Sequence, residues 1–240
     1  MRQQRRYVGA LVLAGITVGG LSACSPDKNF KDDSAIPEKI TSVRLDSTTG
    51  SVTLHGRAGA DTVSVHRSVD YSGDKPGTTV TVENGALVLH GCGRHCSVGY
   101  TVELPAGLPI SGQTSNGAIS LSQVGQVNVS TTNGGITLDG VAGPAEVRTT
   151  NGAIKGTGLN GDHVQAETSN GRIDLTPVRA QDVKAKTSNG GIALTVPADA
   201  YKVSADTDNG SKNIGVGNDP NGRYRLDLRT SNGGITVRTS

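Results

Sequence analysis

The sequence is poor in aromatic residues. Of its 240 residues, none is tryptophan, one is phenylalanine and five are tyrosine. Proteins that bind single-stranded nucleic acids stack the bases on aromatic side chains, and aromatic platforms for sugars need the same rings. The composition therefore argues against both kinds of platform.

An excess of charge of either sign is lacking too. The chain has 23 basic and 21 acidic residues, but Arg2, Arg5 and Arg6 lie in a segment that we expect to be removed. Residues 24–240 then hold 20 basic and 21 acidic residues, so the mature chain is nearly neutral. Nucleic-acid binding requires clustered lysine and arginine, and we expect no nucleic-acid partner.

The apolar run near the N-terminus is too short to cross a membrane. Residues 8–20 are mostly apolar or glycine, and these 13 residues fall short of the about 20 that a transmembrane helix needs. With the three arginines before it, the run has the n-region and h-region of a secretory signal peptide. We therefore assign residues 1–23 to a signal peptide.

The signal segment ends in Leu21-Ser22-Ala23-Cys24, which resembles a bacterial lipobox. The resemblance implies transfer of a diacylglyceryl group to Cys24 and cleavage before it, which anchors the mature protein to the extracytoplasmic side of a membrane. A secretory signal with a chance cysteine is the alternative. Arg5-Arg6 also leaves export by the twin-arginine route open.

What the sequence does have is a repeat. The turn sequence Thr-Ser-Asn-Gly-x-Ile, or a close variant, returns every 17–23 residues through the second half. Its Asn-Gly pairs begin at Asn116, Asn133, Asn151, Asn170, Asn189, Asn209 and Asn232. Such a period is typical of stacked units that bury their apolar face only against their neighbours. We assign residues 111–240 to a solenoid of these rungs.

Apolar and polar residues alternate on both sides of each Asn-Gly corner, as in strands with one buried face. The Asn-Gly pair supplies the positive backbone dihedrals of a sharp corner. A threonine stands two residues before every Asn, for example Thr131 before Asn133. We expect this threonine to point inward beside stacked asparagines, in a hydrogen-bonded ladder.

Two arrangements fit this pattern: an antiparallel stack of hairpins, or a coil whose rungs pair in parallel. The charges three residues before each Asn favour the coil, because their signs alternate along the chain. This column consists of Arg148, Glu167, Lys186, Asp206 and Arg229. In a coil, successive members are neighbours about 4.8 Å apart, and their opposite charges penalise a slipped register.

Two segments precede the repeats. Residues 24–39 are polar with two prolines and predict a lipidated cysteine with a flexible tether, unless part of them is a first strand. Residues 40–110 alternate around Gly50 and Gly85 and are therefore also expected to be β. Their turns are less uniform, so hairpins can replace simple coils, and we expect this section to cap the stack.

The chain resembles the bacterial "putative adhesin" domains of unknown function that are described as β-strand repeats. The shared features are the repeated corner sequence, Val102–Gly107 and Val196-Pro197-Ala198, and the resemblance covers about residues 40–240. It implies an all-β fold, a right-handed parallel β-helix-like solenoid with a less regular N-terminal section, in an extracytoplasmic protein. The family supplies no catalytic residues.

Cys92 and Cys96 form the one local cluster of reactive side chains. In an exported protein, two cysteines at this spacing are expected to form a disulfide. A small metal site with His90 and His95 is the alternative, although four ligands within seven residues reach tetrahedral geometry poorly. We assign no metal ligand and no cofactor.

A catalytic site is not evident. The carboxylates of the rungs scatter over different columns, and the five histidines form no clear base-nucleophile pair. One spacing is stretched to 23 residues by a loop at 215–222, preceded by Lys212 where isoleucine is expected. Because inserted loops often carry contacts, Lys212, Asn218 and Asp219 are candidates for contact with a partner.

The prediction is a lipid-anchored extracytoplasmic lipoprotein whose non-catalytic β-repeat domain serves adhesion or cell-envelope interaction. Its partners are the membrane, through the lipid on Cys24, and an envelope protein or glycan. An accessory role in envelope-stress sensing is one alternative. A polysaccharide-cleaving β-helix enzyme is the alternative from another class.

Overall fold

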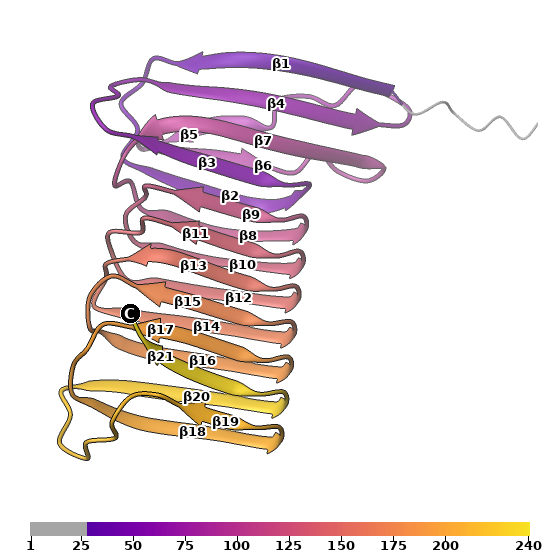
Figure 1. The fold of residues 1–240 in the computed structure, drawn as a ribbon. Coiled ribbons are helices and arrows are strands. Elements are labelled where there is room, and N and C mark those ends of the chain that lie inside the picture. The colour runs from indigo at the N-terminus through magenta and orange to yellow at the C-terminus, as the bar shows by residue number, and fades with distance from the viewer. Residues whose placement is uncertain (1–27) are drawn as a thin grey trace, which may run out of the picture.

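The computed structural model describes residues 28–240, and all its regular elements are strands, arranged in two sheets that face each other in a rod-like stack (Figure 1). Sheet A has 11 strands in the order β1 (Lys28–Ile36), β4 (Val63–Tyr71), β7 (Cys96–Pro105), β3 (Val52–Arg57), β9 (Ile119–Ser122), β11 (Ile136–Asp139), β13 (Ile154–Leu159), β15 (Ile173–Pro177), β17 (Ile192–Val196), β21 (Ile235–Thr239) and β19 (Lys212–Ile214). Sheet B has 10 strands in the order β18 (Tyr201–Asn209), β20 (Tyr224–Asn232), β16 (Asp182–Asn189), β14 (His163–Asn170), β12 (Ala145–Asn151), β10 (Val127–Asn133), β8 (Ile110–Asn116), β2 (Ser42–Thr49), β6 (Ala86–His90) and β5 (Val80–Glu83). No helix in the described part of the chain could span a membrane.

Each regular rung contributes one strand to each sheet. β10, for example, runs in sheet B to the corner at Asn133, and β11 continues from that corner in sheet A. Successive rungs pair in parallel and in register, so that Val127 lies beside Ala145 and Ile136 beside Ile154. The apolar positions of both strands are buried between the sheets. The predicted all-β parallel solenoid is therefore confirmed.

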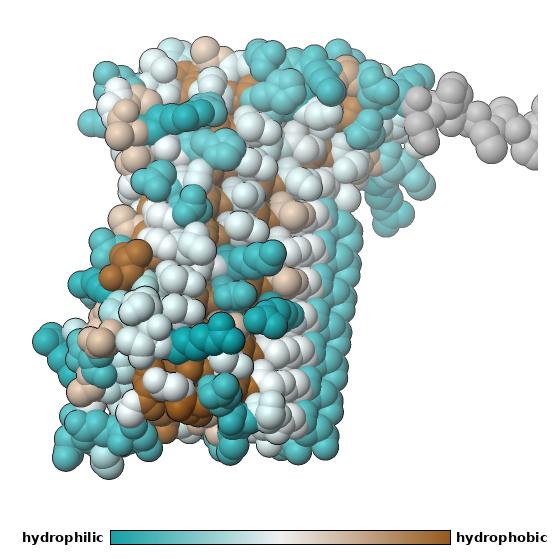
Figure 2. Space-filling view, in the orientation of Figure 1, coloured by the Kyte–Doolittle hydropathy of each residue, from teal (hydrophilic) through white to brown (hydrophobic). Residues whose placement is uncertain are grey.

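Two ladders of hydrogen bonds hold the corners. Thr168 is 6% exposed, and its hydroxyl donates to the carbonyl of Gly152 on the preceding rung at 3.0 Å. Each corner asparagine amide donates to the side-chain oxygen of the next at 2.8–3.0 Å, in the spatial order Asn209, Asn232, Asn189, Asn170, Asn151, Asn133, Asn116. Figure 2 shows a continuous hydrophilic column along the right edge of the rod, where these corners lie. The prediction of inward threonines beside stacked asparagines is confirmed.

The glycine after each corner asparagine is needed mainly because successive rungs approach closely. A Cβ on Gly171 would collide with the carbonyl oxygen of Gly152 in the preceding rung, and Gly134 and Gly152 have the same contact with the rung before them. None of the repeated corner asparagines has a positive φ, whereas some corner glycines do, such as Gly134 at 154°. The prediction that the pair supplies positive dihedrals therefore holds only for those glycines.

The last two rungs are exchanged relative to their order in the sequence. The rung β20/β21 lies between β16/β17 and β18/β19, at the lower end of Figure 1. Lys186 consequently pairs with Arg229, and Arg229 with Asp206. The predicted alternation of charge is wrong at this step. The two rungs match at Val203 and Leu226 but not at Lys212, which is exposed on β19 and pairs with the buried Ile235 of β21.

The rod ends at β18/β19. Val203, Ala205, Ile214 and Val216 pack against the core there but are only partly buried. Figure 2 shows apolar surface near this lower end of the molecule. This end of the core has no further rung to cover it among residues 28–240.

The N-terminal section combines one regular rung with antiparallel strands. The rung β2/β3 turns at Gly50 and pairs in parallel with β8/β9. β5 and β6 form a hairpin whose turn residues Asn84 and Gly85 both have positive φ, and β4 pairs antiparallel with β7. The prediction that residues 40–110 are β, with hairpins among the coils, is confirmed.

Residues 28–36 form β1, which pairs antiparallel with β4 along its whole length. The ring of Phe30 lies edge-on to Tyr71, with centroids 5.8 Å apart. Asp32 accepts a hydrogen bond from Arg67 Nε at 2.9 Å, and this bond lowers the pKa of the Asp32 carboxyl. The predicted tether is wrong for these residues, because backbone pairing with β4 and these side-chain contacts order a segment that lacks apolar periodicity.

Candidate binding groove

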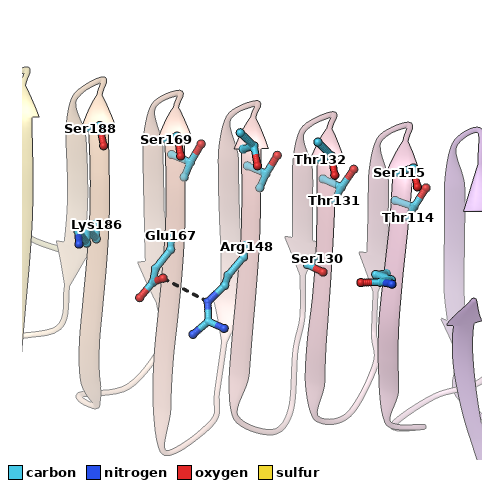
Figure 3. Close-up of a pocket in the computed structure, with 14 residues that line it drawn as sticks. Thr114, Ser115, Ser130, Thr131, Thr132, Arg148, Glu167, Ser169, Lys186 and Ser188 are labelled. Atoms are coloured by element: carbon cyan, nitrogen blue, oxygen red, sulfur yellow. Dashed lines mark hydrogen bonds and ion pairs between the residues drawn. The ribbon is translucent and has the colours of Figure 1, made fainter. Parts of the chain in front are cut away.

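A groove runs along the outer face of sheet B, across five successive rungs. It has a volume of about 540 Å³ and is lined by residues of β8, β10, β12, β14 and β16. Figure 3 shows its side chains projecting from neighbouring strands in repeated positions. They are Gln113, Thr114, Ser115, Ser130, Thr131, Thr132, Arg148, Thr149, Thr150, Glu167, Thr168, Ser169, Lys186 and Ser188.

One edge of the groove is a column of exposed hydroxyl groups. Each of the five rungs that line the groove places a serine or threonine immediately before its corner asparagine, and these side chains are exposed. The column consists of Ser115, Thr132, Thr150, Ser169 and Ser188. Because neighbouring strands in a sheet lie about 4.8 Å apart, the groove offers a hydroxyl at each such step. A hydroxyl both donates and accepts hydrogen bonds, so this edge suits a ligand that is itself rich in hydroxyls.

The other edge carries charged side chains that form ion pairs. Glu167 accepts from Arg148 Nε at 3.2 Å and lies 3.6 Å from Lys184 Nζ. A second hollow of about 230 Å³ shares Glu167 and Lys186 with the groove and extends it toward Asp227 and Arg229. Together, the two hollows span six strands of sheet B, from β8 to β20.

The residues that line the two hollows offer hydroxyl groups and paired charges to a ligand. Within the described residues that line the two hollows there is no histidine or cysteine, and the hydroxyls stand in an array without an adjacent base. Most glycoside hydrolases use two carboxyl groups that flank one bond, one of them able to give up a proton. Here Glu167 and Asp227 are each engaged by arginine.

A family model matches residues 35–240, nearly the whole of the described chain, and its description is Toastrack DUF4097. The chain belongs to the Toastrack DUF4097 family. No curated protein matches this Toastrack chain.

Three solved structures are similar to the Toastrack chain at low identity. A structure titled "putative cell adhesion protein" from Clostridium sporogenes shares 12% identity, with a TM-score of 0.42, over 89% of this chain and 100% of its own. A "putative adhesin" from Bacteroides fragilis shares 15%, with a TM-score of 0.46, over 89% and 97%. A "putative adhesin" from Parabacteroides merdae shares 10%, with a TM-score of 0.45, over 89% and 96%.

The predicted disulfide between Cys92 and Cys96 is present, with Cα atoms 5.7 Å apart. It links Cys92, which precedes β7, to Cys96, the first residue of that strand, in the N-terminal section of the Toastrack domain. Neither cysteine lines the groove. The predicted lipidation site, Cys24, lies outside the described residues.

The residues predicted to contact a partner lie at the end of the rod, not in the groove. Asn218 Oδ1 accepts a hydrogen bond from the backbone N–H of Val203 at 2.9 Å, and the N–H of Asp219 donates to the carbonyl of Tyr201 at 2.9 Å. The loop therefore covers part of the outer edge of β18. Lys212 is exposed on β19 in the other sheet.

The hydroxyl column was not predicted, although a signal for it exists in the sequence. The residue before each corner Asn is serine or threonine in six of the seven repeats, the exception being Asp208. Such small polar residues are also ordinary at turns, so the column has meaning only once the rungs are known to stack in register.

Proposed function

We propose that this Toastrack domain is a non-catalytic adhesion module that binds an extended glycan in the groove. The observation that carries the proposal is the exposed hydroxyl column, which repeats at every strand along an open groove. An extended sugar chain presents hydroxyls at steps similar to the strand spacing of about 4.8 Å. Without aromatic rings in the groove, each sugar is held by polar contacts alone, so affinity comes from many weak subsites along the polymer.

The test removes hydroxyls from the groove without altering the core. Thr132→Leu with Thr150→Leu deletes two adjacent hydroxyls, and the matched control, Thr137→Leu with Thr239→Leu, changes two exposed threonines of sheet A. We expect the first variant of the full chain to lose at least about tenfold in affinity on a glycan array. The control is expected to bind like the unchanged chain. Equal binding by all three chains would contradict the proposal.

We propose further that lipidated Cys24 holds the domain on the extracytoplasmic face of a bacterial membrane. The lipobox-like sequence supports this proposal. Cys24 precedes Lys28 by four residues, which span at most about 14 Å when fully extended. Since β1 begins at Lys28, this arrangement holds the N-terminal end of the rod close to the lipid headgroups.

The anchor is tested by fractionation of cells that produce the full chain. The unchanged chain is expected in the membrane fraction, with mass spectrometry showing a diacylglyceryl group on Cys24. Cys24→Ser is expected to release the chain from the membrane fraction, whereas Cys92→Ser with Cys96→Ser is expected to leave it there. A membrane-bound Cys24→Ser chain would contradict the lipid anchor.

A further inference from the structure

Two cations stand side by side in the second hollow, where the charge pattern predicted opposite signs. Lys186 on β16 and Arg229 on β20 are paired in the parallel register. Like charges directly opposite on neighbouring strands are destabilising. On the other side of Lys186 the same column carries Glu167, and on the other side of Arg229 it carries Asp206. The Lys186–Arg229 step is therefore the point where two positive charges meet.

The nearby carboxylates neutralise this pair only in part, through the contact of Arg229 with Asp227. Glu167 is shared by Arg148 and Lys184. Asp227 is shared by Arg229, at 3.0 Å from Nε, and Arg225, at 3.8 Å from Nη2. With Asp206, which is paired with Arg229 in the register, and Asp182, which accepts from the backbone N–H of Arg225 at 2.8 Å, four acids stand among five cations in this part of the protein.

Lys186 forms no ion pair with any described residue, and Asp206, although next to Arg229 in the register, forms none with it. This excess of positive charge is confined to this part of the protein. Without Arg2, Arg5, Arg6 and Asp27, the 23 basic and 21 acidic residues of the whole chain leave 20 of each in residues 28–240.

Hydroxyl groups accompany both cations. Ser188 and Ser231 are the residues before the paired corner asparagines Asn189 and Asn232. Two adjacent strands therefore each present a cation and a hydroxyl on the same side of the sheet. Guanidinium and ammonium groups form strong charge-assisted hydrogen bonds with carboxylates and phosphates, and hydroxyls can donate to the remaining oxygens.

We propose that Lys186 and Arg229, with Ser188 and Ser231, form a subsite for the anionic group of an acidic polysaccharide. The proposal rests on the glycan-binding function proposed above and adds the class of glycan. The polymer lies along the groove, with its hydroxyls on the column that runs from Ser115 to Ser188. Its carboxylate or phosphate enters the second hollow, which Lys186 and Arg229 line. This ligand supplies negative charge to Lys186, which forms no ion pair with a described residue, and to Arg229, which shares Asp227 with Arg225.

The experiment measures binding of the full chain to three polymers by surface plasmon resonance. Polygalacturonate supplies carboxylates, a phosphomannan supplies phosphates, and dextran is neutral. The test variant is Lys186→Gln with Arg229→Gln, and its matched control, Lys155→Gln with Arg238→Gln, removes one lysine and one arginine from the outer face of sheet A. Thermal unfolding is recorded for every chain.

We expect one or both acidic polymers to bind the unchanged chain at least tenfold more tightly than dextran, and the better one identifies the anion. The test variant is expected to lose about tenfold for each cation removed, while its binding to dextran and its thermal midpoint do not fall. If Lys186 and Arg229 served only to stabilise the fold, the test variant would instead have a lower thermal midpoint.

Three results would overturn the anion subsite. Acidic polymers and dextran could bind equally, the test variant could keep its affinity for acidic polymers, or the control could lose as much as the test variant. If the unchanged chain binds dextran and Thr132→Leu with Thr150→Leu weakens that binding, the glycan-binding function stands without the subsite. If the unchanged chain binds none of the three polymers, both proposals fail together.

Discussion

The middle of the rod and its two ends follow different rules. From β8/β9 to β16/β17, rungs that follow one another in the sequence are also neighbours in space. At each end a rung is inserted instead: β20/β21 lies between β16/β17 and β18/β19, and β2 lies between β6 and β8. The first and last rungs of the sequence, β2/β3 and β20/β21, are thus paired on both sides. The edge strands of the sheets are β18 and β19 at one end and β1 and β5 at the other.

This difference shows what the repeat encodes and what it leaves open. The repeated corner sequence specifies how a rung is built and how it contacts any neighbour, since the threonine and asparagine ladders are the same at every step. It does not specify which rung comes next. The order at the ends depends on the loops that connect the rungs, such as residues 215–223, which carry the chain past the edge strand.

The largest loss of stability is expected from a substitution at a corner glycine, where the rungs in the middle of the rod are most tightly stacked. Gly171→Ala places a methyl group against the carbonyl of Gly152, and we expect a loss of about 3 kcal/mol or more in the free energy of unfolding, or failure to fold. Gly217→Ala, in the loop at the end of the rod, meets open space and is expected to be neutral. Denaturant unfolding of both variants tests the contrast, and equal stability would show that corner glycines are not required by stacking.

A smaller effect is expected from the asparagine ladder, and it separates an inner position from an end. Asn170→Ala removes hydrogen bonds to both Asn151 and Asn189, with an expected cost of about 1 kcal/mol. Asn209→Ala removes only the bond to Asn232 at the edge of the stack and is expected to cost about half as much. Thermal unfolding can compare the two, and a larger loss at Asn209 would mean that the ladder does not act through paired neighbours.

The smallest effect is expected at the N-terminal end, and it depends on pH. Arg67 lowers the pKa of Asp32, so this pair contributes stability above the unfolded pKa of aspartate and loses that contribution as the pH falls through the folded value. Since the carboxylate is 39% exposed, the contribution is expected to stay below about 1 kcal/mol. Acidification should therefore increase hydrogen exchange in β1 before the regular rungs, and Asp32→Asn should remove that pH dependence. Uniform loss of protection along the rod would contradict this order.

Much of the regular architecture could be predicted from the sequence. The alternation of apolar residues and the repeated corner define parallel rungs because every rung repeats the same local pattern. The Cys92–Cys96 disulfide followed from the spacing of two cysteines in a chain that we expected to be exported. In contrast, β1 has no apolar periodicity, and its order depends on partners some 35 residues away, such as Arg67 for Asp32.

The groove could not be predicted for a similar reason. Its hydroxyl column requires the register between rungs, and its pair of cations requires the exchanged order of the last two. Neither property is local. Lys186 and Arg229 are separated by the whole rung β18/β19 in the sequence, yet they are neighbours in sheet B.

The exchanged order of the last rungs is tested most directly by paired cysteines. A disulfide needs Cα atoms within about 7 Å, which neighbouring strands about 4.8 Å apart satisfy and strands two steps apart do not. We expect Lys186→Cys with Arg229→Cys to form a disulfide that peptide mapping by mass spectrometry detects, and Lys186→Cys with Asp206→Cys to remain reduced. A disulfide between positions 186 and 206, with none between 186 and 229, would show that the rungs stack in sequence order and would remove the basis of the anion subsite.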